Sequence, residues 1–136
     1  MKRIFAVVAT LALALNVAFA ATPTTEPSLP ADIGTWEKLE LSCTTRHAEG
    51  VFLQEDYRQV VEGSLKFTSV VTLNGQKVAQ SEYSEARGSA SFVQYVKNSP
   101  ENNWLAYGQE EMPQAIAHFL SEIGLTKEQF ESCADE

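Results

Sequence analysis

The sequence predicts an α+β fold in which a small antiparallel sheet is followed by C-terminal helices, and three observations favour it. In the first half of the chain apolar and polar residues alternate, which is the period of a strand with one buried face. Asn74 and Gly75 form the pair that is typical of a tight β-hairpin turn. Near the C-terminus apolar residues recur instead at helical spacing. Strands first and helices last indicate a single α+β domain.

Residues 1–20 have the pattern of a cleavable secretory signal peptide. Two basic residues follow the initiating methionine, and the uncharged run from Ile4 to Val17 is shorter than the roughly 20 residues of a transmembrane helix. Small residues at positions 18 and 20 fit the cleavage rule, so we predict cleavage before Ala21. A retained anchor is the alternative, which the short run disfavours. We therefore expect a periplasmic protein without a membrane anchor, with secretion into the medium as the alternative.

The chain is acidic, and loss of the signal makes it more so. The full sequence has 10 basic and 18 acidic residues and a net charge of −8. Because Lys2 and Arg3 are lost with the signal, the mature charge is −10. Such an excess repels nucleic acid and favours a protein partner with a basic surface.

The two cysteines, Cys43 and Cys133, predict one disulfide, because thiols tend to pair in an exported protein. The bridge would close a loop of roughly 90 residues and tie an early strand to the C-terminal tail. An intermolecular bridge and two free thiols are the alternatives. A catalytic redox pair is not indicated, since the sequence has no Cys-x-x-Cys spacing.

Composition divides the mature chain into two parts. Residues 21–34 contain three prolines and few apolar side chains, which predicts a flexible leader. Residues 35–136 are long enough for one domain. The alternating residues between Trp36 and Thr45 predict its first strand, with Cys43 pointing inward. Val51–Val61 fits either helical or strand spacing, and its β-branched and aromatic content favours a strand.

The predicted hairpin sets Val71 opposite Val78 and Val70 opposite Ala79 if its turn has two residues. The returning strand is more polar, which suggests an edge strand or a solvent-exposed face. After it, Ser89–Lys97 could be a further strand or a short helix, and the pattern does not decide between them.

Two helices are expected at the C-terminus. Apolar residues from Met112 to Ile123 recur at helical spacing, and Gly124 provides a stop. A second, shorter helix is predicted from Lys127 to about Cys133. Its N-cap would be Thr126.

No catalytic, metal or cofactor motif is present in the sequence. The two histidines, His47 and His118, lie in no zinc-binding pattern, so we expect no metal and no cofactor. His118 precedes Glu122 by four residues, which predicts a surface ion pair. His47 as a general base has no identifiable nucleophile or orienting partner. The chain is therefore more readily interpreted as a binding protein than as an enzyme.

A candidate partner-binding segment surrounds the aromatic residues Trp104 and Tyr107. They stand in a polar setting and are followed by Glu110 and Glu111. Aromatic anchors beside a charged rim are typical of protein interfaces. The alternative is that both rings pack onto the sheet as part of a small core.

These features favour a non-catalytic exported binding protein, such as an inhibitor or immunity protein that masks a basic-surfaced exported hydrolase. Acidity would increase the rate of association with such a partner. One alternative is an envelope assembly or stress factor that contacts other proteins without inhibiting them. Another is a small-ligand binder or minor enzyme, with a cleft between the sheet and the helix Met112–Ile123.

Overall fold

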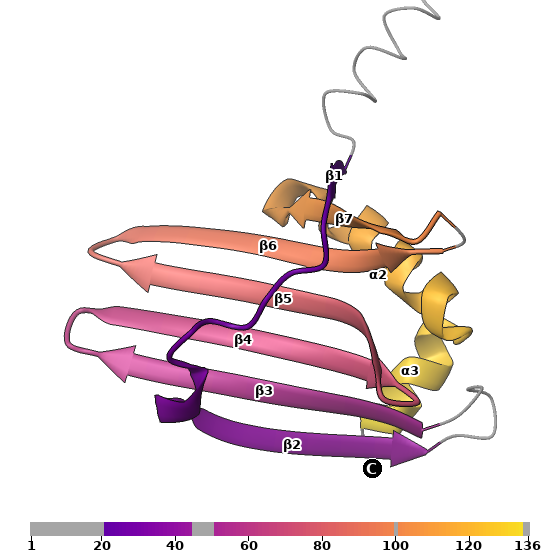
Figure 1. The fold of residues 1–136 in the computed structure, drawn as a ribbon, viewed down its shortest axis with the longest axis horizontal. Coiled ribbons are helices and arrows are strands. Elements are labelled where there is room, and N and C mark those ends of the chain that lie inside the picture. The colour runs from indigo at the N-terminus through magenta and orange to yellow at the C-terminus, as the bar shows by residue number, and fades with distance from the viewer. Residues whose placement is uncertain (1–20, 45–50, 100, 135–136) are drawn as a thin grey trace, which may run out of the picture.

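The computed structural model describes residues 21–44, 51–99 and 101–134. In this part of the chain the strands form one antiparallel sheet in the order β1-β7-β6-β5-β4-β3-β2 (Figure 1). The strands are β1 (Thr22–Thr24), β2 (Glu37–Thr44), β3 (Val51–Val61), β4 (Ser64–Leu73), β5 (Gln76–Ala86), β6 (Ser89–Asn98) and β7 (Asn103–Gly108). From β2 to β7 each strand pairs with the next in sequence, so the sheet is a meander that β1 extends at the β7 edge.

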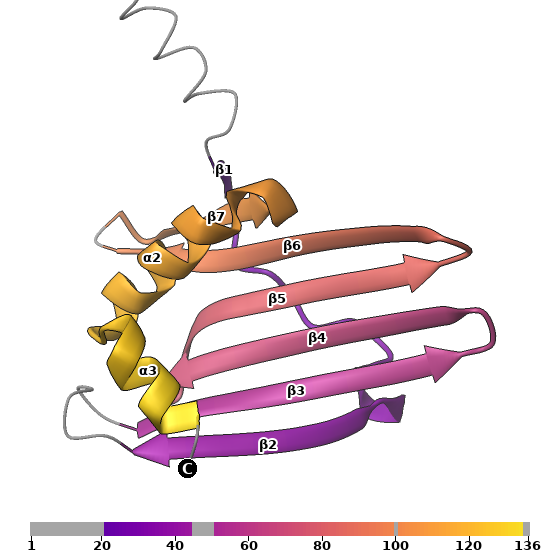
Figure 2. The same cartoon turned by 180° about the vertical axis from the view of Figure 1, so that it is seen from behind.

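The helices follow the sheet in sequence and cover one end of one of its faces (Figure 2). They are η2 (Gln109–Glu111), α2 (Met112–Ile123) and α3 (Lys127–Ala134), whereas the short helix η1 (Ile33–Thr35) precedes β2. The predicted α+β class is thus confirmed, as are both C-terminal helices. Among the described residues no helix has the length and apolar character needed to cross a membrane.

We call the face of the sheet that α2 and α3 cover the helix face. The core lies between this face and the two helices. One buried cluster joins the sheet to the C-terminal end of α2 and contains Phe52, Val71, Val78, Ala79, Ile123 and Leu125. A second cluster contains Val96, Tyr107 and Ala115. Phe119 packs against both clusters. Burial of these apolar side chains therefore holds α2 across the strands.

The opposite face, which we call the leader face, is crossed by residues 25–35 (Figure 1). Residues 21–34, which composition predicts to be a flexible leader outside the folded domain, instead contribute to the sheet, since Thr24 pairs with Trp104. Further along, Lys77 Nζ donates a hydrogen bond to the Pro27 carbonyl at 2.8 Å, and Gln80 Nε2 donates one to the Ser28 carbonyl at 3.2 Å. Composition missed this placement because backbone carbonyls, rather than apolar side chains, make these contacts.

The predicted hairpin is confirmed, but its predicted register is wrong. Asn74 and Gly75 have φ values of 55° and 82°, as a primed turn requires. Val71 lies opposite Ala79 rather than Val78, and Val70 lies opposite Gln80, because the register shifts between Val71 and Thr72. The extra residue on β5 is a β-bulge, which no turn rule predicts.

The remaining elements follow the sequence patterns with one correction. Val51–Val61 is a strand, and the undecided segment Ser89–Lys97 is a strand as well. The suggestion that the returning strand of the hairpin lies at an edge is wrong, since β5 pairs with both β4 and β6. Thr126 does cap α3: Gln129 N donates to its Oγ1 at 3.2 Å, and Thr126 N donates to Gln129 Oε1 at 2.8 Å.

Several predictions fall outside the described residues. The signal peptide and His47 are among them. Cys43 lies in β2 and Cys133 in α3, but their side chains are not described and no disulfide is shown. Export and the disulfide therefore remain predictions.

The contacts of Gln80 predict a stability effect. Its side chain is fully buried; besides its bond to the leader it accepts a hydrogen bond from Lys77 Nζ at 2.9 Å. Gln80→Ala leaves the Ser28 carbonyl without this donor, so we expect the free energy of unfolding to fall by about 1–3 kcal/mol. Urea unfolding measures the change. The exposed Gln76→Ala variant should stay within about 0.5 kcal/mol of the original protein, and equal stability of the two variants would contradict the role of Gln80.

Candidate functional site

A cavity of about 460 Å³ lies between the helix face and the two C-terminal helices. The helices contribute Met112, Ala115, Ile116, Phe119, Leu120, Lys127, Phe130 and Glu131. The strands contribute Gln54, Asp56, Phe67, Ser69, Val71, Ala79, Ser81 and Gln94. The cavity therefore has a mainly apolar roof and a floor that is largely polar.

Three phenylalanine rings fix the roof above the sheet. Phe119 of α2 and Phe130 of α3 meet edge-to-face with ring centroids 5.5 Å apart. Both contact Phe52 of β3, at 6.4 Å for Phe119 and 5.8 Å for Phe130. Edge-to-face pairs add about 0.5–1.5 kcal/mol beyond area burial. Because Phe119 and Phe130 also line the cavity, the contacts that hold the helices also shape the roof.

The polar floor is a row of side chains at one level of four neighbouring strands. The register pairs Asp56 with Ser69, Ser69 with Ser81, and Ser81 with Gln94. Residues directly opposite in antiparallel strands share a face, so these four residues line up across the helix face. Ser69 Oγ donates a hydrogen bond to Asp56 Oδ1 at 2.6 Å. Gln54 Nε2 donates a second to the same oxygen at 3.1 Å.

At the α3 side of the cavity lie two side chains of opposite charge. Lys127 Nζ and Glu131 Oε1 are 4.0 Å apart, and both side chains are mostly exposed. Such an exposed pair adds little to stability. Because the two charges are opposite and close together, this pair adds no net charge to the cavity lining.

The predicted partner-binding residues do not form one exposed surface. Trp104 and Tyr107 are only 5% and 7% exposed. Tyr107 belongs to a core cluster of the helix face, whereas Trp104, three positions earlier in β7, points to the opposite face. Glu110 is exposed and Glu111 is half-buried, with Oε2 buried and without a partner among the described residues. The structure therefore places the two rings in the core.

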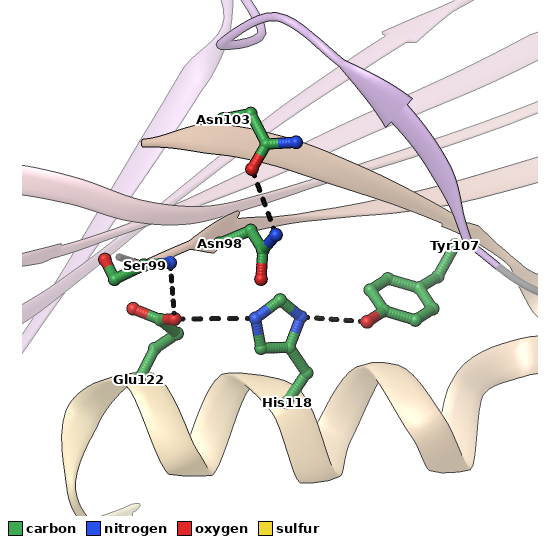
Figure 3. A network of polar contacts seen from close by, with 6 residues as sticks. All are labelled: Asn98, Ser99, Asn103, Tyr107, His118 and Glu122. Atoms are coloured by element: carbon green, nitrogen blue, oxygen red, sulfur yellow. Dashed lines mark hydrogen bonds and ion pairs between the residues drawn. The ribbon is translucent and has the colours of Figure 1, made fainter. Parts of the chain in front are cut away.

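A network of polar contacts lies under α2, and only one of its contacts, the pair His118–Glu122, follows from the sequence pattern (Figure 3). Tyr107 Oη and His118 Nδ1 are 2.8 Å apart. His118 Nε2 lies 3.5 Å from Glu122 Oε1, which also accepts a hydrogen bond from Ser99 N at 2.9 Å. The pair His118–Glu122 was predicted, but its side chains are only 16% and 12% exposed, so it is not a surface pair.

This network connects elements that are distant in sequence. It joins β7 and α2 to Ser99, the residue that follows β6. Beside Ser99, Asn98 Nδ2 at the end of β6 donates to Asn103 Oδ1 at the start of β7 at 3.0 Å (Figure 3). Helical spacing alone could indicate the contact of His118 with Glu122. The contact with Tyr107 depends on how α2 lies on the sheet, which no local pattern shows. Neither Tyr107, His118 nor Glu122 lines the cavity, so the network positions α2 rather than contacting a bound molecule.

The site is equipped for binding through apolar contact and hydrogen bonding. Among the residues that the structure describes, no three His, Cys, Asp or Glu side chains gather as a metal site. Comparison with protein-family models, curated proteins and solved structures finds no match to this chain. The functional interpretation therefore depends on the geometry of the cavity.

The tyrosines predict a loss of stability at alkaline pH. Burial, followed by the nearby charge of Glu111, raises the pKa of Tyr107 above its ordinary value of 10.0. As pH rises, the unfolded chain therefore loses the hydroxyl proton of Tyr107 before the folded protein does. The contribution of this group to the free energy of unfolding is complete below about pH 10 and is lost as pH rises through the higher folded-state pKa. Tyr107→Phe should cost about 1 kcal/mol at neutral pH, through the lost hydrogen bond, and should make the alkaline decline shallower.

Melting temperatures between neutral and strongly alkaline pH measure both effects. Tyr83→Phe is the matched control, because the pKa of Tyr83 is raised mainly by its hydrogen bond to Glu85 in an exposed setting. Solvent weakens such an exposed contribution. An alkaline decline that Tyr107→Phe changes no more than Tyr83→Phe does would refute the role given to Tyr107.

Proposed function

We propose that this domain is an exported binding protein that holds a small, mainly apolar ligand in the cavity under α2 and α3. The cavity is the observation that carries the proposal. Its volume falls within the range of about 300–1,000 Å³ that is typical of ligand pockets. An apolar lining with a few convergent polar groups is likewise the usual composition of such sites.

Ile116 adds a second argument for a ligand. It lines the cavity and yet is 47% exposed. The other large apolar side chains of α2 belong to the core clusters or pack against them; they are Met112, Phe119, Leu120 and Ile123. A ligand in the cavity would cover this side chain and remove its apolar surface from water, which is favourable. The same holds for the uncovered parts of Phe67 and Phe130, which also line the cavity.

The structure supports ligand binding better than it supports the masking of a basic-surfaced hydrolase. Trp104 and Tyr107 were the candidate anchors for such a partner, and both rings are buried. The features that still support it are acidity, small size, the predicted disulfide and the lack of a catalytic motif in the sequence. None of them is specific to an inhibitor, and acidity is a property of many proteins. A role in envelope assembly or stress has no specific support among the described contacts.

We also propose that Cys43 and Cys133 form a disulfide in the exported protein. Cys43 is the register partner of Phe52, and the Phe52 ring contacts the Phe130 ring. Cys133 follows Phe130 by three residues in α3, which places it about one helical turn further on the same side. The bridge would tie α3, and with it part of the roof, to β2.

Ligand binding can be tested by filling the cavity. Ser81 has a small side chain on the floor, and Ser81→Phe would occupy much of the space. We expect the mature protein to bind one molecule of N-phenyl-1-naphthylamine, a neutral apolar fluorophore. Ser81→Phe should weaken this binding at least about tenfold, because steric exclusion removes the apolar contacts.

The matched control is Ser89→Phe, which makes the same change at an exposed position at the start of β6, away from the cavity. It should bind the fluorophore like the original protein. Both variants are first compared by circular dichroism to establish that they are folded. Equal binding by the two folded variants, or none by the original protein, would contradict the proposed function.

The disulfide has its own test. The oxidised mature protein should be lighter by two hydrogens than the reduced form, as measured by intact mass spectrometry. Removing the bridge with Cys43→Ser should cost about 2–5 kcal/mol of stability, because the unfolded chain is no longer restricted. The Cys43→Ser, Cys133→Ser double variant should lose no more than the single variant. Two thiols that react with a labelling reagent in the unfolded, unreduced protein would refute the bridge.

A further inference from the structure

We infer that the ligand of this cavity is a monocation, a protonated amine attached to an apolar body, and that Asp56 receives its ammonium group. The inference rests on the proposed function and names the chemical class of its ligand. It depends on three features: the unused hydrogen-bonding capacity of Asp56, the charge balance around it, and the apolar surfaces beside it.

Hydrogen bonds from neighbouring side chains hold the Asp56 carboxylate in position and leave one of its oxygens able to accept. Ser69 and Gln54 both donate to Oδ1, which orients the carboxylate. Among the described residues Oδ2 has no hydrogen-bond partner, and it is not sealed from solvent. A carboxylate has about four lone-pair sites. Asp56 can therefore accept further hydrogen bonds from a donor that enters the cavity.

The charge of Asp56 is not balanced within the described part of the chain. It makes no ion pair there, whereas Lys127 and Glu131, the other charged side chains on the cavity lining, face each other. Arg58, two residues further along β3, is paired with Glu37. One negative charge thus remains on the cavity lining, and one positive charge on the ligand would match it.

Partial burial makes this match effective. Asp56 is half-buried and lies under an apolar roof, where a charge interacts more strongly than in bulk water. Hydrogen bonds between an ammonium and a carboxylate are stronger than those between neutral groups. A carboxylate ligand would instead bring two like charges together, which is unfavourable. The acidic surface of the whole chain opposes an anion in the same way.

The apolar part of the ligand has its own surfaces. Phe67 lies beside the polar row on β4, and Ile116 and Phe119 lie above it on α2. An amine that contacts Asp56 could extend its apolar body along these side chains. Recognition then combines one charge-assisted contact with apolar burial, as in a cationic amphiphile.

The experiment compares three probes of equal chain length: decylamine, which is protonated at neutral pH, decanol and decanoate. Each displaces the neutral fluorophore from the folded mature protein, below the concentration at which the probe aggregates. We expect decylamine to bind at least about tenfold more tightly than decanol, because hydrogen bonds to charged groups are the stronger ones. Decanoate should bind most weakly.

Asp56→Asn keeps the shape and the acceptor oxygen for Ser69 but removes the charge. It should weaken decylamine binding about tenfold and leave decanol binding unchanged. The control Glu62→Gln removes one charge at an exposed position outside the cavity and should leave all affinities unchanged. If Asp56→Asn does not fold, the order of the three probes on the original protein still decides the inference.

The outcomes separate this inference from the proposed function. If decanol or decanoate binds as tightly as decylamine, or if Asp56→Asn keeps the preference for the amine, the inference is wrong and ligand binding stands. If Glu62→Gln loses the preference as well, general surface charge is responsible and Asp56 is not the recognition group. If the original protein binds neither the fluorophore nor any of the three probes, the proposed function itself fails.

Discussion

The contacts of Phe119 are the constraint on which the rest of the structure depends. Its ring meets Phe52 and Phe130, and it packs against both buried clusters of the helix face. One side chain thereby holds α2 and α3 and ties them to the sheet. Because these two helices are short, they cover only one end of long strands (Figure 2). The cavity lies on the helix face, with Ile116 half-exposed beside it.

The two faces of the sheet are covered in different ways. On the leader face, residues 25–35 cross the strands (Figure 1). Gln80, which bonds to the Ser28 carbonyl, and Thr68, which lines the same hollow as Pro30, are almost fully buried there. Hydrogen bonds to backbone carbonyls fasten this cover, so it has a defined position. On the helix face apolar packing holds the cover, and polar side chains of the sheet remain under it. A bound molecule is therefore easier to accommodate on the helix face.

Local patterns in the sequence predicted most elements but not their assembly. The turn at Asn74 and Gly75, the strand Val51–Val61 and the helix Met112–Ile123 follow from composition and spacing, because neighbouring residues determine them. The course of the leader depends on contacts between residues about 50 positions apart. The contact between Tyr107 and His118 likewise depends on how a helix lies on the sheet. Composition alone does not distinguish burial of Trp104 and Tyr107 from a role in an interface, and only the position of β7 in the sheet shows that both rings are buried.

The polar floor could not be predicted either, because Asp56, Ser69, Ser81 and Gln94 come from four strands and meet only through register. A one-residue slip moves every side chain of a strand to the other face. With the register of a regular two-residue hairpin, Ser69 would face Gln80 and not Ser81.

The bulge on β5 thus determines what α2 covers. Adjacent residues of a regular strand point to opposite faces, but at the bulge Val78 and Ala79 belong to the same buried cluster. The bulge also places Ala79 and Ser81 on the floor of the cavity. Both side chains are small, so the space above them stays open. The long side chain of Gln80 lies on the leader face instead, where it bonds to the Ser28 carbonyl. A single extra residue therefore fastens the leader on one face and leaves room for a ligand on the other.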